Sequence, residues 1–155
     1  MKLSELIGPD SILLGFDPTD KWSCIHDLVQ HLCDAGRLDE ALVEPVREAV
    51  LARERTMSTG MEEGVAIPHA ALEEISEVVA ILGVINREDG LDFESIDGRP
   101  SRLIVLLLIP KSQKLLHIRT LADIARVLSR DLVREELLSA EDSDRAHAIL
   151  VAGEA

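Results

Sequence analysis

Two of the five histidines stand where an imidazole can do chemistry. His69 directly follows Val65–Pro68, a short β-type run closed by a proline, so we expect it at the edge of a strand, held by the backbone and open to a partner. His117 opens a helical stripe that continues through Leu121, Ile124 and Leu128. Because imidazole titrates near neutral pH, both are candidates for nucleophilic or acid–base work. The pattern also fits a solvent-facing loop residue at His69 and a half-buried core residue at His117.

Arg53 is a further candidate, at the end of the predicted helix that precedes this segment. It closes that helix just before a loop containing Ser58-Thr59-Gly60. A cation in the last turn of a helix commonly stabilises the helix dipole, and this is the simpler interpretation of Arg53. The position of Arg53 alone does not decide between this structural role and a role in chemistry. The same is true of the two histidines.

The spacing of the remaining ligand-type residues argues against a metal site. Cys24 and His26 are two residues apart and lie on different faces of a predicted helix, and no spacing matches a structural zinc site. A small metal-dependent hydrolase built on His69 and His117 lacks a third ligand. We therefore expect no metal and no cofactor. His26 and His31, five positions apart on the first predicted helix, are expected to be ordinary surface residues, and His147 in the last helix has no recognisable partner.

Composition excludes several classes of function. The 29 acidic and 16 basic residues give a net charge of −13, which repels nucleic acid and anionic membrane surfaces. The longest apolar run, Leu103–Ile109, is far shorter than the roughly 20 residues that span a bilayer. Met1–Gly8 does not resemble a signal peptide, and the two cysteines form no CxxC pair. These features predict a reduced, cytoplasmic protein without membrane insertion.

Hydrophobic periodicity predicts one layered α/β domain over residues 1–155, with a mixed central sheet flanked by helices. Strand-type runs are expected at Ile12–Gly15, Val65–Ile67, Val78–Ile85, Leu91–Ile96 and Leu103–Ile109. The first helical stripe runs from Trp22 to Cys33 and stops before Gly36, and the second follows Asp39 as its N-cap. Further helices are expected from Leu116, with Leu121, Ile124, Ala125 and Leu128 inward, then over Leu132–Leu138 and over Arg145–Val151 with Ser143 as cap.

Taken together, these residues resemble the type-2 enzyme IIA family of the bacterial phosphoenolpyruvate-dependent phosphotransferase system, whose members serve fructose, mannitol and nitrogen regulation. The strongest resemblance lies in Ser58-Thr59-Gly60 and Gly64-Val65-Ala66-Ile67-Pro68-His69. It continues at the same spacing through nearly the whole chain: Arg53-Glu54-Arg55 before this segment, and Ile96-Asp97-Gly98-Arg99-Pro100, Ile109-Pro110 and His117-Ile118 after it.

The resemblance implies a phosphoryl relay. His69 would accept a phosphoryl group from the phosphocarrier HPr or a similar phosphohistidine protein, and would pass it on or signal by it. His117 and Arg53 would stabilise the phosphoryl oxygens, and the hydroxyls and amides of Ser58, Thr59 and Gly60 would add neutral donors. Enzyme IIB or a regulatory target would be the next partner.

Two departures from the family pattern concern charge near the predicted phosphoryl group. Glu62 stands near a position that usually carries an additional glycine, and Ala70-Ala71 replaces the more common Gly-Lys or Ala-Arg. An added carboxylate and a missing cation would both disfavour a phosphorylated histidine if these side chains pointed inward. A free-standing copy favours the nitrogen-regulatory branch. The alternatives are a sugar-branch enzyme IIA and a regulatory binding module that His69 phosphorylation switches.

Overall fold

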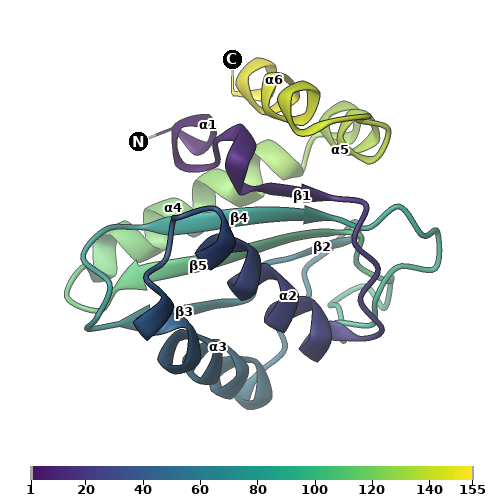
Figure 1. Cartoon of the computed structure of the whole chain (residues 1–155). Helices are drawn as coiled ribbons and strands as arrows, with labels where there is room; N and C mark the ends of the chain where they lie inside the picture. Colours follow the sequence, from purple (N-terminus) through teal and green to yellow (C-terminus); the bar gives the residue numbers. More distant parts are fainter. Residues whose placement is uncertain (1, 155) are drawn as a thin grey trace.

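The computed structural model describes residues 2–154 and contains a mixed sheet between two layers of helices (Figure 1). The strand order is β1-β4-β5-β2, with β3 also beside β5, and only the β4–β5 pair is antiparallel. The predicted fold class is confirmed, as are four of the five predicted strands. The strands are β1 (Ile12–Leu14), β2 (Val65–Ala66), β3 (His69–Leu72), β4 (Val79–Val84) and β5 (Leu103–Pro110).

The helices divide between the two faces of the sheet (Figure 1). Helices α2 and α3 pack on one face, and α4, α5 and α6, with the short α1, pack on the other. No helix within residues 2–154 is long and apolar enough to cross a membrane. The bounds are α1 (Leu3–Leu6), α2 (Lys21–Asp34), α3 (Val43–Thr56), α4 (Lys114–Leu128), α5 (Asp131–Leu138) and α6 (Ser143–Gly153), with 3-10 turns η1 (Pro9–Ser11) and η2 (Glu40–Leu42).

The position of strand β5 between two layers of helices explains why its sequence is a continuous apolar run. All of its residues are buried, because alternate side chains enter the two cores on opposite faces of the sheet. Val105 and Leu107 join the core that includes Ile124 of α4, whereas Leu106 joins the core that includes Val46 of α3. The sheet therefore separates two aliphatic cores.

Strands β2 and β3 form one edge strand with a break at Ile67–Pro68. The register along β5 is the same on both sides of the break, since Val65 pairs with Leu103 and His69 pairs with Leu107. Proline lacks an N–H and is tolerated at a sheet edge, and its carbonyl still accepts a hydrogen bond from the Leu107 N–H at 3.0 Å. The strand period places His69 on the α4 side of the sheet.

The segment Leu91–Ile96, predicted to be a strand, is an irregular loop. A single bridge joins Leu91 to Ser101, and the Asp92 carboxylate accepts the Glu94 N–H in a local turn with φ of 53° at Glu94. Leu91 and Phe93 are nevertheless buried. The alternation of apolar and acidic residues arises because these two side chains anchor the loop in the core, and not because the backbone pairs with a strand.

The helices begin and end close to the predicted points, with three corrections. Asp142, not Ser143, caps α6, because its extended backbone lets its carboxylate accept an N–H from the first turn. Asp39 caps the 3-10 turn η2, which leads into α3. On α4, Ala125 is exposed and Val127 fills the core instead. Gly36 has the expected left-handed conformation after α2, with φ of 75°.

Candidate active site

The structure brings His69 and His117 together at the edge of the sheet. Their ring centroids are 5.2 Å apart, with an angle of 72° between the planes, so that the edge of one ring meets the face of the other. His69 is the first residue of β3, and His117 lies in the first turn of α4, which begins shortly after β5 ends. Two histidines 48 positions apart in the sequence thus form one pair because β3 and β5 run parallel and α4 returns over the same edge.

His69 is more buried than its sequence context predicted. Only 9% of its surface is exposed, so the expectation of an open, solvent-facing residue is wrong. Its Nδ1 lies 2.7 Å from the carbonyl oxygen of Ile67. A carbonyl can only accept, so Nδ1 carries the hydrogen and Nε2 keeps the free lone pair of the neutral ring.

The surroundings of His69 favour its neutral form. Burial lowers the pKa of His69 below its ordinary value of 6.5, and the charges of Arg53 and His117 lower this pKa further. The Ile67 carbonyl and the Glu54 carboxylate oppose this change and raise the pKa, without reversing its direction. A neutral imidazole with a free Nε2 is the nucleophilic form.

Arg53 reaches the site from the opposite layer of helices. It lies in the last turn of α3, half-buried, and its Nη1 donates a hydrogen bond to the Met57 carbonyl at 2.7 Å. This bond holds the side chain across the end of its own helix but uses only one of the several N–H donors of the guanidinium. The positive charge of Arg53 lowers the pKa of His69.

The loop residues predicted as phosphoryl donors are turned into the protein. The Ser58 hydroxyl donates to the Phe93 carbonyl, and the Gly60 N–H donates to Ser58 Oγ at 3.1 Å. The Thr59 N–H donates to the Glu54 carboxylate at 3.0 Å, and its hydroxyl donates to the same group. The hydroxyls of Ser58 and Thr59 and the N–H groups of Thr59 and Gly60 therefore donate within the protein in this structure, and not toward an anion. Their contacts instead fix the loop beside β2.

Sequence reasoning missed two residues next to the site. Lys21 and Glu54 have exposed fractions of 7% and 2%, and Lys21 Nζ lies 3.3 Å from a carboxylate oxygen of Glu54. Trp22, predicted on the inner stripe of α2, is 38% exposed, and Lys21 takes a buried place beside it. The position of Glu54 directly after Arg53 was a usable signal. Nothing local predicts a buried lysine, since lysine is ordinarily exposed.

The two departures from the family pattern differ in place: one is on the loop before β2, and the other directly follows His69 in β3. Glu62 is exposed. Its neighbour Glu63 takes the left-handed conformation that favours glycine, with φ of 60°, and its carboxylate pairs with Arg99 at 2.9 Å. Ala70 is buried on the α3 side of the strand, and Ala71 is exposed on the side of His69. A cation missing beside the site would therefore be missing at position 71.

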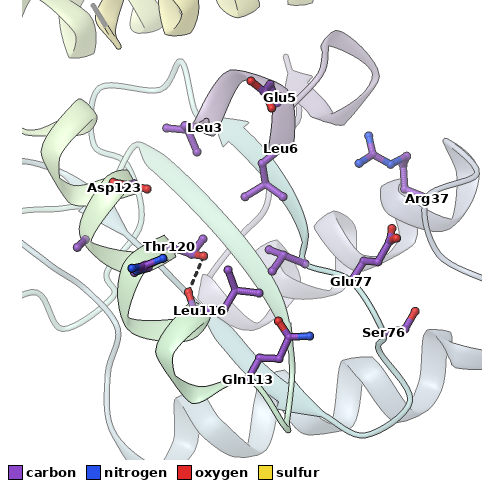
Figure 2. Close-up of a pocket in the computed structure, with 13 residues that line it drawn as sticks. Leu3, Glu5, Leu6, Arg37, Ser76, Glu77, Gln113, Leu116, Thr120 and Asp123 are labelled. Carbon is purple, nitrogen blue, oxygen red and sulfur yellow. Dashed lines mark hydrogen bonds between the residues drawn. The ribbon is translucent and has the colours of Figure 1, made fainter. Parts of the chain in front are cut away.

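A hollow of about 750 Å³ lies between α1, α4 and the start of β4 (Figure 2). Leu6 and Thr120 line it, as do charges of both signs such as Glu77 and Arg119, but neither His69 nor His117 does. Within residues 2–154, no cluster of three or more histidine, cysteine, aspartate or glutamate side chains is arranged to hold a metal ion.

Comparison with known proteins defines the class. The family model described as "Phosphoenolpyruvate-dependent sugar phosphotransferase system, EIIA 2" matches residues 5–152. This chain therefore belongs to the EIIA 2 family of the phosphotransferase system. It is similar in fold to the nitrogen regulatory protein IIA-Ntr from Neisseria meningitidis, with a TM-score of 0.81, 28% identity, and coverage of 96% of this chain and 98% of that one.

Individual relatives come from both the nitrogen-regulatory and the sugar branches. The chain is 29% identical to a nitrogen regulatory protein of Bradyrhizobium diazoefficiens, over 97% of this chain and 95% of that protein. It is 33% identical to the fructose-specific EIIABC component of Bacillus subtilis over 93% of this chain, but it spans only 22% of that larger protein. The IIA mannitol structure from Escherichia coli shares the fold, with a TM-score of 0.77, 20% identity, and coverage of 92% of this chain and 97% of that one.

Proposed function

We propose that this chain is a phosphoryl carrier that is phosphorylated on Nε2 of His69 by an HPr-like phosphohistidine protein. The observation that carries the proposal is the pair of rings 5.2 Å apart, in which the Nδ1 of His69 is held by the Ile67 carbonyl. Membership of the EIIA 2 family supports it. A neutral, buried imidazole with one free nitrogen is suited to form a labile N–P bond.

The proposed step is an in-line displacement at phosphorus. The Nε2 lone pair of His69 forms the new N–P bond while the N–P bond of the donor breaks, and that electron pair returns to the donor's imidazole. The hydrogen stays on Nδ1, which continues to donate it to the Ile67 carbonyl. The equatorial oxygens carry the charge of the transition state, and the proposed donors to them are the Arg53 guanidinium and a ring N–H of His117.

The surroundings of the site suit a protein partner. Three large apolar side chains near the ends of α3 and α4 are exposed: Met57 (68%), Leu115 (66%) and Ile118 (67%). Leu115 and Ile118 flank His117 in the sequence, and Met57 is the residue whose carbonyl holds Arg53. Enzyme IIA mannitol forms a complex with phosphorylated enzyme IIB mannitol in a structure that shares this fold. An enzyme IIB-like protein or a regulatory target is the proposed acceptor.

We assign the carrier to the nitrogen-regulatory branch. The likeness to IIA-Ntr and to a nitrogen regulatory protein of nearly the same length supports this assignment. The second candidate is a sugar-branch enzyme IIA, which the 30% identity to a fructose-specific EIIA component of Haloferax volcanii favours, since the match covers 96% of this chain and 94% of that protein. In either branch, His69 phosphorylation can also switch the binding of a regulatory partner.

The proposal is tested by incubating the chain with phosphoenolpyruvate, enzyme I and HPr or its nitrogen-branch counterpart. We expect the chain to acquire a phosphate that is labile to acid and stable to base, as expected for an N–P bond. A hydroxyl ester of phosphate, or no incorporation with either donor, would contradict it. Comparing the two donors also separates the nitrogen branch from the sugar branch.

The lowered pKa of His69 predicts how its chemistry depends on pH. The imidazole should stay neutral, and therefore nucleophilic, at pH values where a free histidine with its pKa of 6.5 is already protonated. As the pH falls below about 6.5, the unfolded chain takes up a proton before the folded one does, so the free energy of unfolding should fall until the pH passes the folded pKa. An NMR titration of the ring should give a pKa below 6.5. A value above it would contradict the prediction.

Replacing Glu62 with glycine should leave phosphorylation almost unchanged. Its side chain is exposed, so its charge is screened by solvent and salt over about 8–10 Å. We expect the initial rate of phosphate incorporation, measured at physiological salt, to stay within about twofold of wild type, as suits an exposed charge. A clear acceleration in Glu62→Gly would show that this carboxylate does approach the phosphoryl group.

A further inference from the structure

A buried ion pair beside His69 has no place in the phosphoryl chemistry described so far. Lys21 begins α2, and Glu54 lies in the last turn of α3 next to Arg53. Their side chains are 9% and 0% exposed and approach to 3.3 Å. Lys21 Nζ also lies 3.7 Å from the Glu94 carboxylate and 4.8 Å from the Trp22 ring centroid. Burying two charges is costly, and such a pair is weak evidence for added stability.

The Glu54 carboxylate is joined to His69 by a chain of hydrogen bonds. It accepts the Thr59 N–H at 3.0 Å and also the Thr59 hydroxyl. The Thr59 carbonyl accepts the Ile67 N–H at 3.1 Å, and the Ile67 carbonyl holds Nδ1 of His69 at 2.7 Å. The end of α3 is thereby connected to the broken edge strand at the position that orients the imidazole.

We propose that Lys21 and Glu54 are positioning residues for phosphorylation of His69. Glu54 fixes Thr59, and through it the Ile67 carbonyl that orients the ring. Lys21 holds that carboxylate in place and balances its charge, so that a doubly negative phosphoryl group can be accepted close to a buried acid. This inference rests on the proposed function, and it assigns the pair a role in the same site without contact with the phosphoryl group.

The charges around the pair explain why the lysine is needed. The Glu54 carboxylate faces Lys21 from α2 and Thr59 from the loop, and its charge acts on His69 of β3. Arg53 lies next to Glu54 on α3, and the Glu94 carboxylate lies on the other side of Lys21. Thr59 donates two hydrogen bonds to this carboxylate, from its N–H and from its hydroxyl. Without Lys21, an ionised Glu54 would repel the incoming phosphoryl group, and this repulsion is stronger at a buried site than in water.

The Lys21→Met variant should therefore be phosphorylated more slowly. At about pH 8 we expect the initial rate to fall about tenfold, the size of effect that a lost charge-assisted interaction produces. This deficit should disappear when the Glu54 carboxylate is neutralised as well. A purely structural defect would not be repaired by that second substitution.

The double variant Lys21→Met/Glu54→Gln keeps the test valid if the single variant folds poorly. It removes both charges, and glutamine retains an oxygen that accepts a hydrogen bond from Thr59. We expect this variant to recover most of the wild-type rate. The matched control is Arg145→Met, which changes the net charge equally but breaks only a surface pair with Glu136, at 3.4 Å. It should be phosphorylated like wild type.

A second measurement does not depend on phosphorylation. Amide hydrogen exchange by NMR should be faster at Thr59 and Ile67 in Lys21→Met, and unchanged in Arg145→Met. If wild type accepts no phosphoryl group, the proposed function fails, whereas the exchange result still reports on the positioning chain. If wild type is phosphorylated and Lys21→Met matches it in rate and in exchange at both amides, the positioning role is wrong.

Discussion

The His69→Ala variant should take up no phosphoryl group from phosphorylated HPr or its nitrogen-branch counterpart. His69 is the residue whose Nδ1 is fixed by a carbonyl and whose Nε2 is free, and alanine supplies no nucleophile in its place. We expect that His117, whose ring centroid lies 5.2 Å away, does not replace His69 as acceptor. The measurement is incorporation of labelled phosphate, followed by its stability in acid and base.

The free energy of unfolding of His69→Ala must be measured together with its phosphorylation. With only 9% of its surface exposed, His69 contributes packing and one hydrogen bond, so the substitution should lower the free energy of unfolding by about 1–2 kcal/mol. That cost leaves a folded protein, which circular dichroism and urea unfolding will show. The control is His26→Ala, an exposed residue on α2, which should incorporate phosphate normally. Undiminished incorporation in His69→Ala would remove the central proposal.

The sequence predicted the parts of this fold that depend on local periodicity. Val78–Ile85 and Leu103–Ile109 read as strands covered on both faces, and both are buried central strands. The alternation in Leu91–Ile96 has the same local appearance as an exposed strand, but a loop anchored by Phe93 produces it equally well. Periodicity reports which side chains are buried, and it does not report whether the backbone finds a partner.

The residues of the candidate site were predictable, but the hydrogen bonds and ion pairs around them were not. The motif around Pro68 and the spacing to His117 named the two rings that meet in the structure. The burial of Lys21 was not predictable, because it depends on an acid that another helix presents 33 positions later. For the same reason, the hydroxyls of Ser58 and Thr59 looked available for an anion, whereas tertiary contacts use them inside the protein.

The Arg53→Lys variant should lose a large part of the phosphorylation rate. Because both loop hydroxyls and the N–H groups of Thr59 and Gly60 are engaged elsewhere, Arg53 and His117 are the principal proposed donors to the phosphoryl oxygens. Loss of one such donor costs about 10²–10³ in rate, or about 2.7–4 kcal/mol, at a site built to stabilise developing charge. Lysine should recover only part of this, since a point charge does not reproduce a planar donor fork. The matched control is Arg55→Lys in the same helical turn, where the side chain is exposed.

Substitutions of His117 should separate the two half-reactions of the relay, which are phosphorylation of His69 and transfer to the next acceptor. Glutamine keeps a neutral N–H donor, so His117→Gln should still be phosphorylated on His69 but should pass the group more slowly to an enzyme IIB-like acceptor. His117→Ala has no such donor, and its rate of phosphorylation on His69 should already fall by about 10²–10³. Rapid-quench measurement of each half-reaction distinguishes the two outcomes. If His117→Ala accepted and released the phosphoryl group at wild-type rates, the contact between the two rings would be packing alone. The stabilisation of the transferring group would then rest on Arg53, and Arg53→Lys would show a correspondingly greater loss.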